Sequence, residues 1–380
     1  MKTMGAAGML TALPEAAFGL HAGGGPIASE VVLAGVDADA KPKHSIKFGV
    51  IGLDHAHIMG ITAAVIRGGG ELAAFYSTLP NAISNFQKIY PNARLAKSED
   101  EILDDPQIQL VTSASIPNLR APLGVRVMKH GKDFLSDKPA MTTLEQLAEV
   151  RRVSAETGKM FGIMYSERLE VPAAVQASYL VKAGAIGKIV QTINIAPHQV
   201  NAPSRPDWFW DPAQYGGILC DIGSHQADQF VYYTGSTTAE VTASQIANVN
   251  YPTHPEFQDV GDMMLHGNGG AGYVRVDWFT PDALGTWGDG RLFILGTEGY
   301  IELRKYIDVA GRPGGNHLFI VDQKQTRYID CRNVALPFGP QLVADVVNRT
   351  HTAQDQEQAL LAAELVLKAQ RDAKVLTFTV

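Results

Sequence analysis

Residues 45–166 alternate short apolar segments with amphipathic ones, and this alternation limits the fold more than any other feature of the chain. The apolar segments have the composition of buried strands, whereas the segments between them carry apolar residues at helical spacing. Such alternation predicts a parallel, doubly wound sheet with helices on both faces. The expected strands are 46–51, 72–77, 109–114, 133–137 and 160–166, and the expected helices include 55–67, 80–90 and 142–158.

The pattern changes after Arg168, where runs of strand composition follow one another with only short loops between them. Such runs predict a largely antiparallel sheet, open on one face and covered by helices on the other. We therefore expect residues 1–43 as a leader or arm, 44–166 as an α/β domain and 167–380 as an α+β domain. The strands expected in the second domain are 188–196, 240–246, 262–266, 272–279, 291–295, 300–303, 317–321 and 326–331, with helices at 172–183, 339–349 and 355–370.

The composition argues against two classes of partner. The 380 residues carry a net charge of −7 and show no cluster of lysine and arginine with interleaved aromatic residues, so no nucleic-acid partner is expected. No run of about 18 apolar residues is present, so no membrane span is expected. Cys220 and Cys331 match no metal-ligand spacing; two buried free thiols are expected, with one bridge between them as the alternative.

The first 43 residues differ in composition from the rest of the chain. Residues 1–12 are small and apolar behind the single Lys2, and a run of glycines at 23–25 follows. The segment is similar to the apolar part of a twin-arginine export leader without its arginines, and it is equally consistent with a flexible arm. The protein is therefore expected to be periplasmic or otherwise exported if the leader is real, and cytoplasmic if it is not.

The turn after the first expected strand reads Gly49-Val50-Ile51-Gly52-Leu53-Asp54-His55-Ala56-His57. A Rossmann nucleotide site has a glycine-rich turn here, because the backbone must approach a diphosphate at a helix N-terminus. With Gly52 as the first fingerprint glycine, Asp54 occupies the position of the second and His57 that of the third. An aspartate adds a side chain and a repelling charge where phosphate should come close.

Three arrangements would accommodate this departure. Asp54 turns away as a helix N-cap, or His55 and His57 offset its charge, or these three residues form a metal site. Their spacing matches no common set of metal ligands, so no metal is expected and the residues are interpreted as cofactor-binding. At the end of the second strand, Ser77 stands where an NAD-preferring enzyme places an acid, which leaves the choice between NAD and NADP open.

Two further motifs carry residues suited to proton transfer. Lys138 lies in Asp137-Lys138-Pro139, directly after a parallel strand, at the sheet edge where such folds bind ligands. Asp221 and His225 follow two glycines, and their spacing of four predicts one helix with both side chains on the same face. A carboxylate so placed orients or tunes an imidazole, which suits His225 as a general base. The structural alternatives are a solvated lysine and an ordinary Asp–His hydrogen bond.

Taken in order, these motifs resemble those of the glucose–fructose oxidoreductase/inositol dehydrogenase (Gfo/Idh/MocA) family. The resemblance runs from about Lys47 to the C-terminus and includes Ile116-Pro117-Asn118, Tyr165-Ser166-Glu167-Arg168 and the run from Gly216 to Asp228. It departs from the family at Asp54 and His57, and at Arg120, where the family commonly has a histidine. It implies a Rossmann domain that binds NAD or NADP, with Lys138 as the catalytic lysine, His225 as the proton acceptor and Asp221 as a substrate-binding or His-orienting carboxylate.

The resemblance also implies a function, an NAD(P)-dependent oxidoreductase acting on a hydroxyl of a sugar, polyol or glycoside. Two alternatives stay open: a redox-neutral glycosidase or lyase that recycles tightly bound NAD(P), and a non-catalytic member that has lost dinucleotide binding. The open sheet face predicts a homodimer or homotetramer. Residues expected at the cofactor are Gly49, Gly52, Asp54, His55, His57, Ser77, Pro117 and Asn118, and those expected at the carbohydrate substrate are Arg168, Arg205, Trp208 and Asp228.

Overall fold

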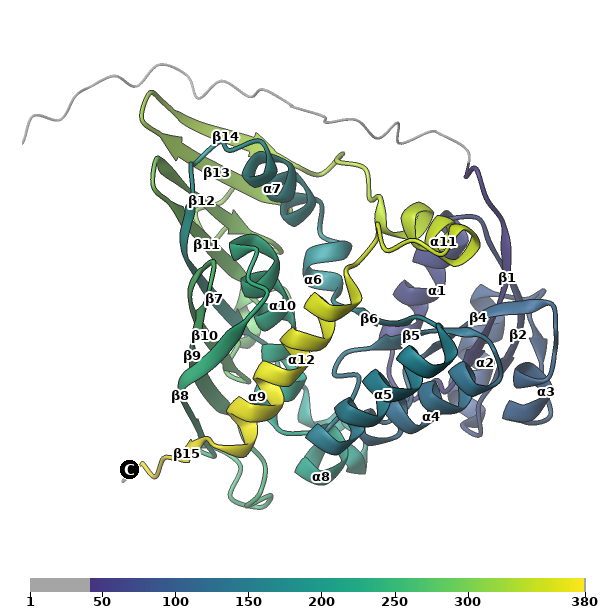
Figure 1. The fold of residues 1–380 in the computed structure, drawn as a ribbon. Coiled ribbons are helices and arrows are strands. Elements are labelled where there is room, and N and C mark those ends of the chain that lie inside the picture. The colour runs from purple at the N-terminus through teal and green to yellow at the C-terminus, as the bar shows by residue number, and fades with distance from the viewer. Residues whose placement is uncertain (1–41, 379–380) are drawn as a thin grey trace, which may run out of the picture.

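The computed structural model describes residues 42–378, which form two β-sheets with helices packed around and between them (Figure 1). The expected leader lies outside these residues apart from its last two positions. Across residues 42–378, no helix is both long enough and apolar enough to cross a bilayer. Cys220 and Cys331 are buried free thiols, as the sequence predicted.

The first sheet is parallel throughout and has the strand order of a Rossmann fold, β3-β2-β1-β4-β5-β6. Its strands alternate with helices as expected. One strand was missed, because two residues are too few to show a periodicity. The strands are β1 (Ile46–Ile51), β2 (Gly70–Tyr76), β3 (Arg94–Leu95), β4 (Ile108–Ser113), β5 (Asp133–Asp137) and β6 (Phe161–Met164), and the helices are α1 (His57–Arg67), α2 (Pro80–Ile89), α3 (Glu99–Leu103), α4 (Pro117–Lys129) and α5 (Leu144–Thr157).

The second sheet has the order β14-β13-β12-β11-β7-β10-β9-β8-β15. It is mainly antiparallel, as predicted, with parallel pairing only between β7 and β10 and between β8 and β15. Residues alternate between a buried face and a more exposed one: Val274 and Val276 are buried, whereas Met264 and Leu295 are exposed. Its strands are β7 (Ile189–Pro197), β8 (Ala239–Ala247), β9 (Val260–Gly267), β10 (Gly270–Asp277), β11 (Arg291–Gly296), β12 (Gly299–Arg304), β13 (His317–Asp322), β14 (Thr326–Asp330) and β15 (Lys374–Val375).

The C-terminal helices bind the two sheets together. In Figure 1, α12 (Gln356–Arg371) runs between them, and α11 (Phe338–Asn348) lies beside α1. The segment before α12, together with the first residue of that helix, also covers β6, the outer strand of the first sheet. The Gln356 side chain accepts a hydrogen bond from the Phe161 N–H at 2.8 Å, and the Gln354 amide bonds both the N–H and the carbonyl of Ile163 at 3.0 and 2.9 Å. The edge of the parallel sheet is therefore closed by side chains.

The segment that carries Asp221 and His225 differs from its prediction. It forms two helices, α9 (Ile218–Asp221) and α10 (Gly223–Thr234), rather than one. Gly216 and Gly217 precede them with φ of 91° and 85°, in the left-handed region that favours glycine. A Cβ atom on Gly217 would overlap the side chain of Gln370 on α12. The two glycines thus fix where α9 begins and let it pack closely against α12.

Candidate active site

A cleft of about 320 Å³ lies between the carboxyl-terminal edge of the first sheet and the second domain. One wall comes from the loop after β1, from α4 and from the residue that follows β5. The other wall comes from α6 (Ser166–Leu169), α9, α10 and the segments around β7 and β10. Of the residues expected at a site, the cleft brings together His55, His57, Pro117, Lys138, Arg205, Trp208, Asp221 and His225.

Lys138 is buried at the cleft wall and links the end of the parallel sheet to α9. Its Nζ atom donates to the Asp221 carboxylate at 2.8 Å and to the Asp221 carbonyl at 3.1 Å. Burial acts to raise the pKa of Asp221, but the Lys138 ammonium outweighs it and the net pKa is lowered. The Lys138–Pro139 peptide bond is cis. The structural alternative from sequence, a solvated surface lysine, is wrong for Lys138.

His225 lies in the first turn of α10, and its partner is not the one the sequence suggested. The predicted Asp–His pairing is corrected, because the Asp221 carboxylate accepts a hydrogen bond from Lys138 instead of from His225. The Nδ1 atom of His225 is buried without a hydrogen-bond partner. Burial lowers the pKa of His225 to about 3, with the Glu167 carboxylate acting in the opposite direction and Lys138 in the same direction. The imidazole is therefore neutral at physiological pH.

Glu167 is the carboxylate that faces this region, and the sequence analysis did not select it. It is 3% exposed, and its Oε2 atom accepts from Lys305 Nζ at 2.5 Å and from Gln226 Nε2 at 3.0 Å. Lys305 also donates to Gln229 at 2.8 Å. Burial acts to raise the pKa of Glu167, but Lys305 outweighs it and holds the pKa below its usual range. The Oε1 atom is buried without a hydrogen-bond partner, so one oxygen of this charged carboxylate is left unpaired beside the cleft.

Several aromatic and basic side chains complete the second wall. Trp208 lies with its ring 6.3 Å from that of His55, and Arg205 stacks 4.3 Å above the ring of Phe209. His198 and Trp287 also line the cleft, with their rings 4.5 Å apart. Burial lowers the pKa of His198 to about 4. The sequence alone does not show that His198 and Trp287 meet, because they lie 89 residues apart in loops that only the folded second sheet brings together.

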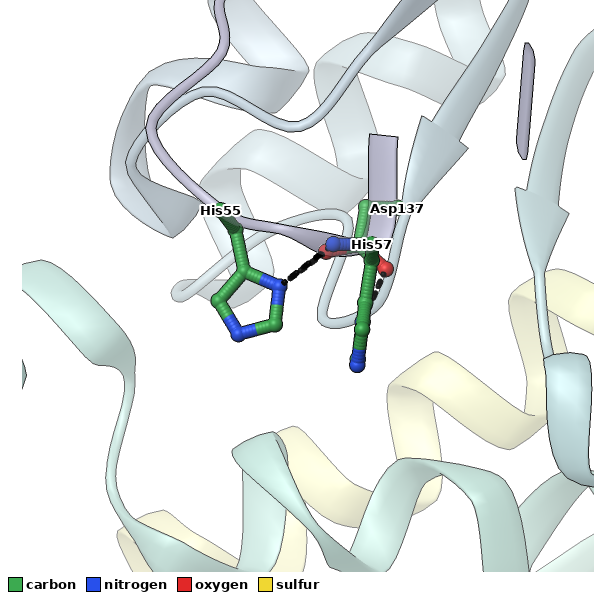
Figure 2. A group of neighbouring side chains, drawn as sticks. All are labelled: His55, His57 and Asp137. Atoms are coloured by element: carbon green, nitrogen blue, oxygen red, sulfur yellow. Dashed lines mark hydrogen bonds and ion pairs between the residues drawn. The ribbon is translucent and has the colours of Figure 1, made fainter. Parts of the chain in front are cut away.

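The loop after β1 meets the end of β5 in a cluster of His55, His57 and Asp137 (Figure 2). The His57 Nδ1 atom lies 3.0 Å from Asp137 Oδ1, and the His55 Nδ1 atom lies 3.5 Å from Asp137 Oδ2. Arg120, where the family commonly has a histidine, is fully buried behind them and lies 3.0 Å from Asp137 Oδ2. Burial acts to raise the pKa of Asp137, but His57 and Arg120 outweigh it and the pKa is well below its usual range.

The turn after β1 requires glycine at position 52, and an unpaired polar atom lies nearby in α4. Gly52 has a φ of 85°, and a Cβ atom there would overlap the Ser115 side chain, so this position requires glycine. Asn118 lies in the first turn of α4 with its Oδ1 atom buried and without a hydrogen-bond partner, available to a donor on a ligand. Ser77 directly follows β2, and its Oγ atom accepts from the Leu79 N–H at 3.2 Å.

Two expectations about this turn are corrected. Asp54 is not the N-cap of α1, since Ala56 occupies that position without a side-chain cap. Burial raises the pKa of Asp54, and Arg120 acts in the opposite direction. Gly49 lies inside β1 rather than in the turn, and its space is limited by Ile102. The glycine at position 49 therefore serves packing of the sheet and not contact with a cofactor.

Arg168 and Asp228 were expected at the substrate, and the structure pairs them with each other instead. Arg168 donates to both carboxylate oxygens of Asp228, at 2.6 and 2.8 Å. Both side chains are buried, and Arg168 lines a separate cavity with Tyr232 and Phe338. The bidentate geometry satisfies both charges. The pair therefore holds α6 against α10 and has no group to offer the cleft.

Two family models match the chain in the order of its two sheets. Residues 46–165 match the model of an oxidoreductase family with an NAD-binding Rossmann fold, and residues 174–302 match the GFO/IDH/MocA C-terminal domain. Among curated proteins, the D-xylose dehydrogenase of Paenarthrobacter nicotinovorans is 28% identical over 131 residues, which are 33% of this chain and 34% of that protein. The inositol 2-dehydrogenase 2 of Saccharopolyspora erythraea is 23% identical over 70% of this chain and 76% of its own length.

Solved structures agree with this assignment. A crystal structure from Erwinia carotovora atroseptica, carrying only the general name of oxidoreductase, is 44% identical with a TM-score of 0.85 and covers 87% of this chain and 100% of its own. A levoglucosan dehydrogenase solved with NADH has the same fold, with 17% identity, a TM-score of 0.70 and coverage of 87% and 98%. The cofactor class expected from the sequence, NAD or NADP, is confirmed by the Rossmann model. The chain belongs to the Gfo/Idh/MocA family.

Proposed function

We propose that the protein is an NAD(P)-dependent oxidoreductase that acts on a hydroxyl-bearing carbon of a sugar, polyol or glycoside. The observation that carries the proposal is the meeting of Lys138, Asp221 and His225 in one cleft at the carboxyl edge of the Rossmann sheet. Edges of this kind are where open α/β sheets bind their ligands. Membership of a family whose relatives include D-xylose and inositol dehydrogenases supports the same class of substrate.

When bound, NAD or NADP supplies the acceptor or donor of hydride at its nicotinamide ring. Gly52, Pro117 and Asn118 would lie along the dinucleotide, with His55 and His57 toward its diphosphate. The Lys138 ammonium, released from part of its contact with Asp221, donates a hydrogen bond to the reacting oxygen of the substrate. His225 is neutral and accepts the proton of the hydroxyl group. The nearby Glu167 carboxylate then stabilises the imidazolium that forms.

The second wall suits a carbohydrate. Trp208 and Trp287 present aromatic rings to the cleft, and such rings stack on the apolar face of a sugar. Arg205 lies beside them and offers donors of fixed geometry to hydroxyl groups. Apolar faces combined with a few fixed polar groups are the usual lining of a small-molecule site.

The proposal is tested by separating cofactor binding from turnover. Calorimetric titration with NAD⁺ and NADP⁺ measures affinity, and absorbance at the reduced nicotinamide band measures turnover with a panel of aldoses, polyols and glycosides. We expect Lys138→Ala to lower turnover by on the order of 100-fold while dinucleotide affinity changes little. The matched control is Lys129→Ala on the outer face of α4, where the side chain is 54% exposed.

Two outcomes would contradict the proposal. One is failure of both dinucleotides to bind at millimolar concentration. The other is turnover of Lys138→Ala within a few-fold of the parent. The ligand released on denaturing the purified protein adds a further check: tightly held NAD(P) that does not exchange during turnover would indicate internal recycling of the cofactor rather than net oxidation of the substrate.

A further inference from the structure

The residues that break the glycine fingerprint converge on one point with a buried carboxylate. His55 and His57 come from the loop after β1, and Asp137 ends β5, the second strand along from β1 in the sheet. One ligand-type atom from each residue lies within 4.8 Å of the other two. Figure 2 shows both imidazole rings beside the Asp137 carboxylate. The Asp137 side chain is only 1% exposed, so the group is not a cluster of solvated surface side chains.

The spacing of these atoms matches that of ligands on one metal ion. Donor atoms that each lie about 2.0–2.1 Å from a shared cation are about 2.9–3.4 Å apart in octahedral or tetrahedral geometry. The Nδ1 atoms of His57 and His55 lie 3.0 and 3.5 Å from the two Asp137 oxygens. The ligand atoms of the three residues all lie within 4.8 Å of one another, so the side chains would have to close by at most about 2 Å to bind one ion.

The hydrogen bonds leave two acceptors facing each other. The backbone N–H of His57 donates to His55 Nδ1 at 3.3 Å, which assigns the acceptor role to that ring nitrogen. It lies 3.5 Å from Asp137 Oδ2, an oxygen without a directed hydrogen bond. Asp137 Oδ1, in contrast, accepts from the Lys138 N–H at 2.8 Å. The Arg120 guanidinium lies 3.0 Å from the same Oδ2 atom, and a cation between the imidazole and the carboxylate would also satisfy the acceptor on His55.

The surrounding charges limit which cation fits. Arg120 lies 3.0 Å from Asp137 Oδ2, and the charge of Lys138 is matched by Asp221. A hard ion such as Mg²⁺ or Ca²⁺ depends on several oxygen ligands, and only one carboxylate is in place here. Two imidazole nitrogens with one carboxylate form the donor set of Zn²⁺ and similar divalent transition metals, and the set leaves coordination positions open.

We propose that His55, His57 and Asp137 bind one divalent transition-metal ion of the Zn²⁺ type, with its open coordination positions toward the cleft. Metal binding would give a role to the histidine that occupies the third glycine position of the fingerprint. Arg120 and the Lys138 N–H hold the Asp137 carboxylate in place as outer-shell partners. The metal site is independent of the proposed function, because neither substrate nor dinucleotide supplies a ligand to it. Metal binding can therefore be measured in the absence of both.

The test is direct metal binding to the full-length chain, produced without a histidine tag and stripped of metal by dialysis against a chelator. We expect calorimetric titration with Zn²⁺, and elemental analysis of the dialysed complex, to give one equivalent per chain. Co²⁺ should bind at the same stoichiometry and give visible absorption bands. His57→Gln and His55→Gln should each weaken Zn²⁺ binding by on the order of 100-fold.

The control variant is His266→Gln, because His266 is an exposed histidine on β9 and lies beside Glu240. It should bind Zn²⁺ as the parent does. Asp137→Asn is a poor first choice, since loss of the buried ion pair with Arg120 can prevent folding, and the two histidine variants avoid this difficulty. Less than half an equivalent of Zn²⁺ at micromolar affinity, or equal affinity in parent and His57→Gln, would overturn the proposal. Turnover and dinucleotide affinity measured separately show whether the proposed function fails on its own.

Discussion

Glu167→Gln should destabilise the protein strongly, because it leaves the Lys305 ammonium buried without a countercharge. Glu167 and Lys305 are 3% and 2% exposed, and their charged atoms lie 2.5 Å apart. Removing one partner of a buried ion pair costs about 3–5 kcal/mol. Gln229 keeps its hydrogen bond to Lys305 at 2.8 Å, and the new amide oxygen still accepts one, so we expect the lower end, about 3 kcal/mol.

The assay is urea unfolding followed by tryptophan fluorescence, applied as a double-mutant cycle. Lys305→Met should cost a similar amount, and the double variant should lose much less than the sum of the two, with a coupling free energy of about 2 kcal/mol or more. Glu256→Gln on the surface is the control and should change stability by less than about 0.5 kcal/mol. Single losses below about 1 kcal/mol, or additive losses in the double variant, would refute the reasoning.

Three further predictions concern pH, the cofactor and assembly. His225 and His198 have folded pKa values of about 3 and 4, below the ordinary 6.5, so unfolding takes up protons and stability falls as pH drops below 6.5. Between its folded pKa and 6.5, each histidine adds about 1.4 kcal/mol per pH unit to the slope of the unfolding free energy against pH. His225→Asn should reduce this slope, measured by urea unfolding, by the same amount. An unchanged slope would contradict the assignment. Asp54→Gly should tighten NAD⁺ or NADP⁺ binding in calorimetry, because it removes a carboxylate from the turn; weaker binding would show that Asp54 helps to hold the cofactor. Light scattering should show a homodimer or homotetramer that covers the open sheet face, and a monomer at micromolar concentration would exclude this assembly.

The sequence predicted most of the fold because the periodicity of each long element is local. Strands such as β1 and β5 and the antiparallel arrangement of the second sheet follow from patterns within a few residues. The two-residue strands β3 and β15 were missed, because so short a segment has no period. The division of this segment into α9 and α10 was also missed, since Ile222 between them keeps a helical backbone, with φ of −74° and ψ of −49°.

The site was predictable only where a motif places a residue at the end of a strand. Lys138 could be located for this reason. Its partner Asp221 is 83 residues away, and Lys305 is 138 residues from Glu167. No spacing rule relates such positions, so Asp221 was paired with His225 in the prediction and Glu167 was assigned no role. The same limit applies to Arg168 and Asp228, whose charges looked available until the fold paired them.

The side chains that cover β6 also set an order of assembly during synthesis. All strands of the parallel sheet have been made once residue 164 is complete, yet the groups that satisfy its outer edge, on Gln354 and Gln356, are made about 190 residues later. Until then, the backbone of β6 presents open hydrogen-bonding groups to any other chain. A nascent chain therefore passes through a long stage in which its first domain has a complete set of strands but an unprotected edge. The edge of β6 is covered only when the start of α12 has been made. The last long helix of the chain therefore completes the packing of the first sheet as well as that of the second.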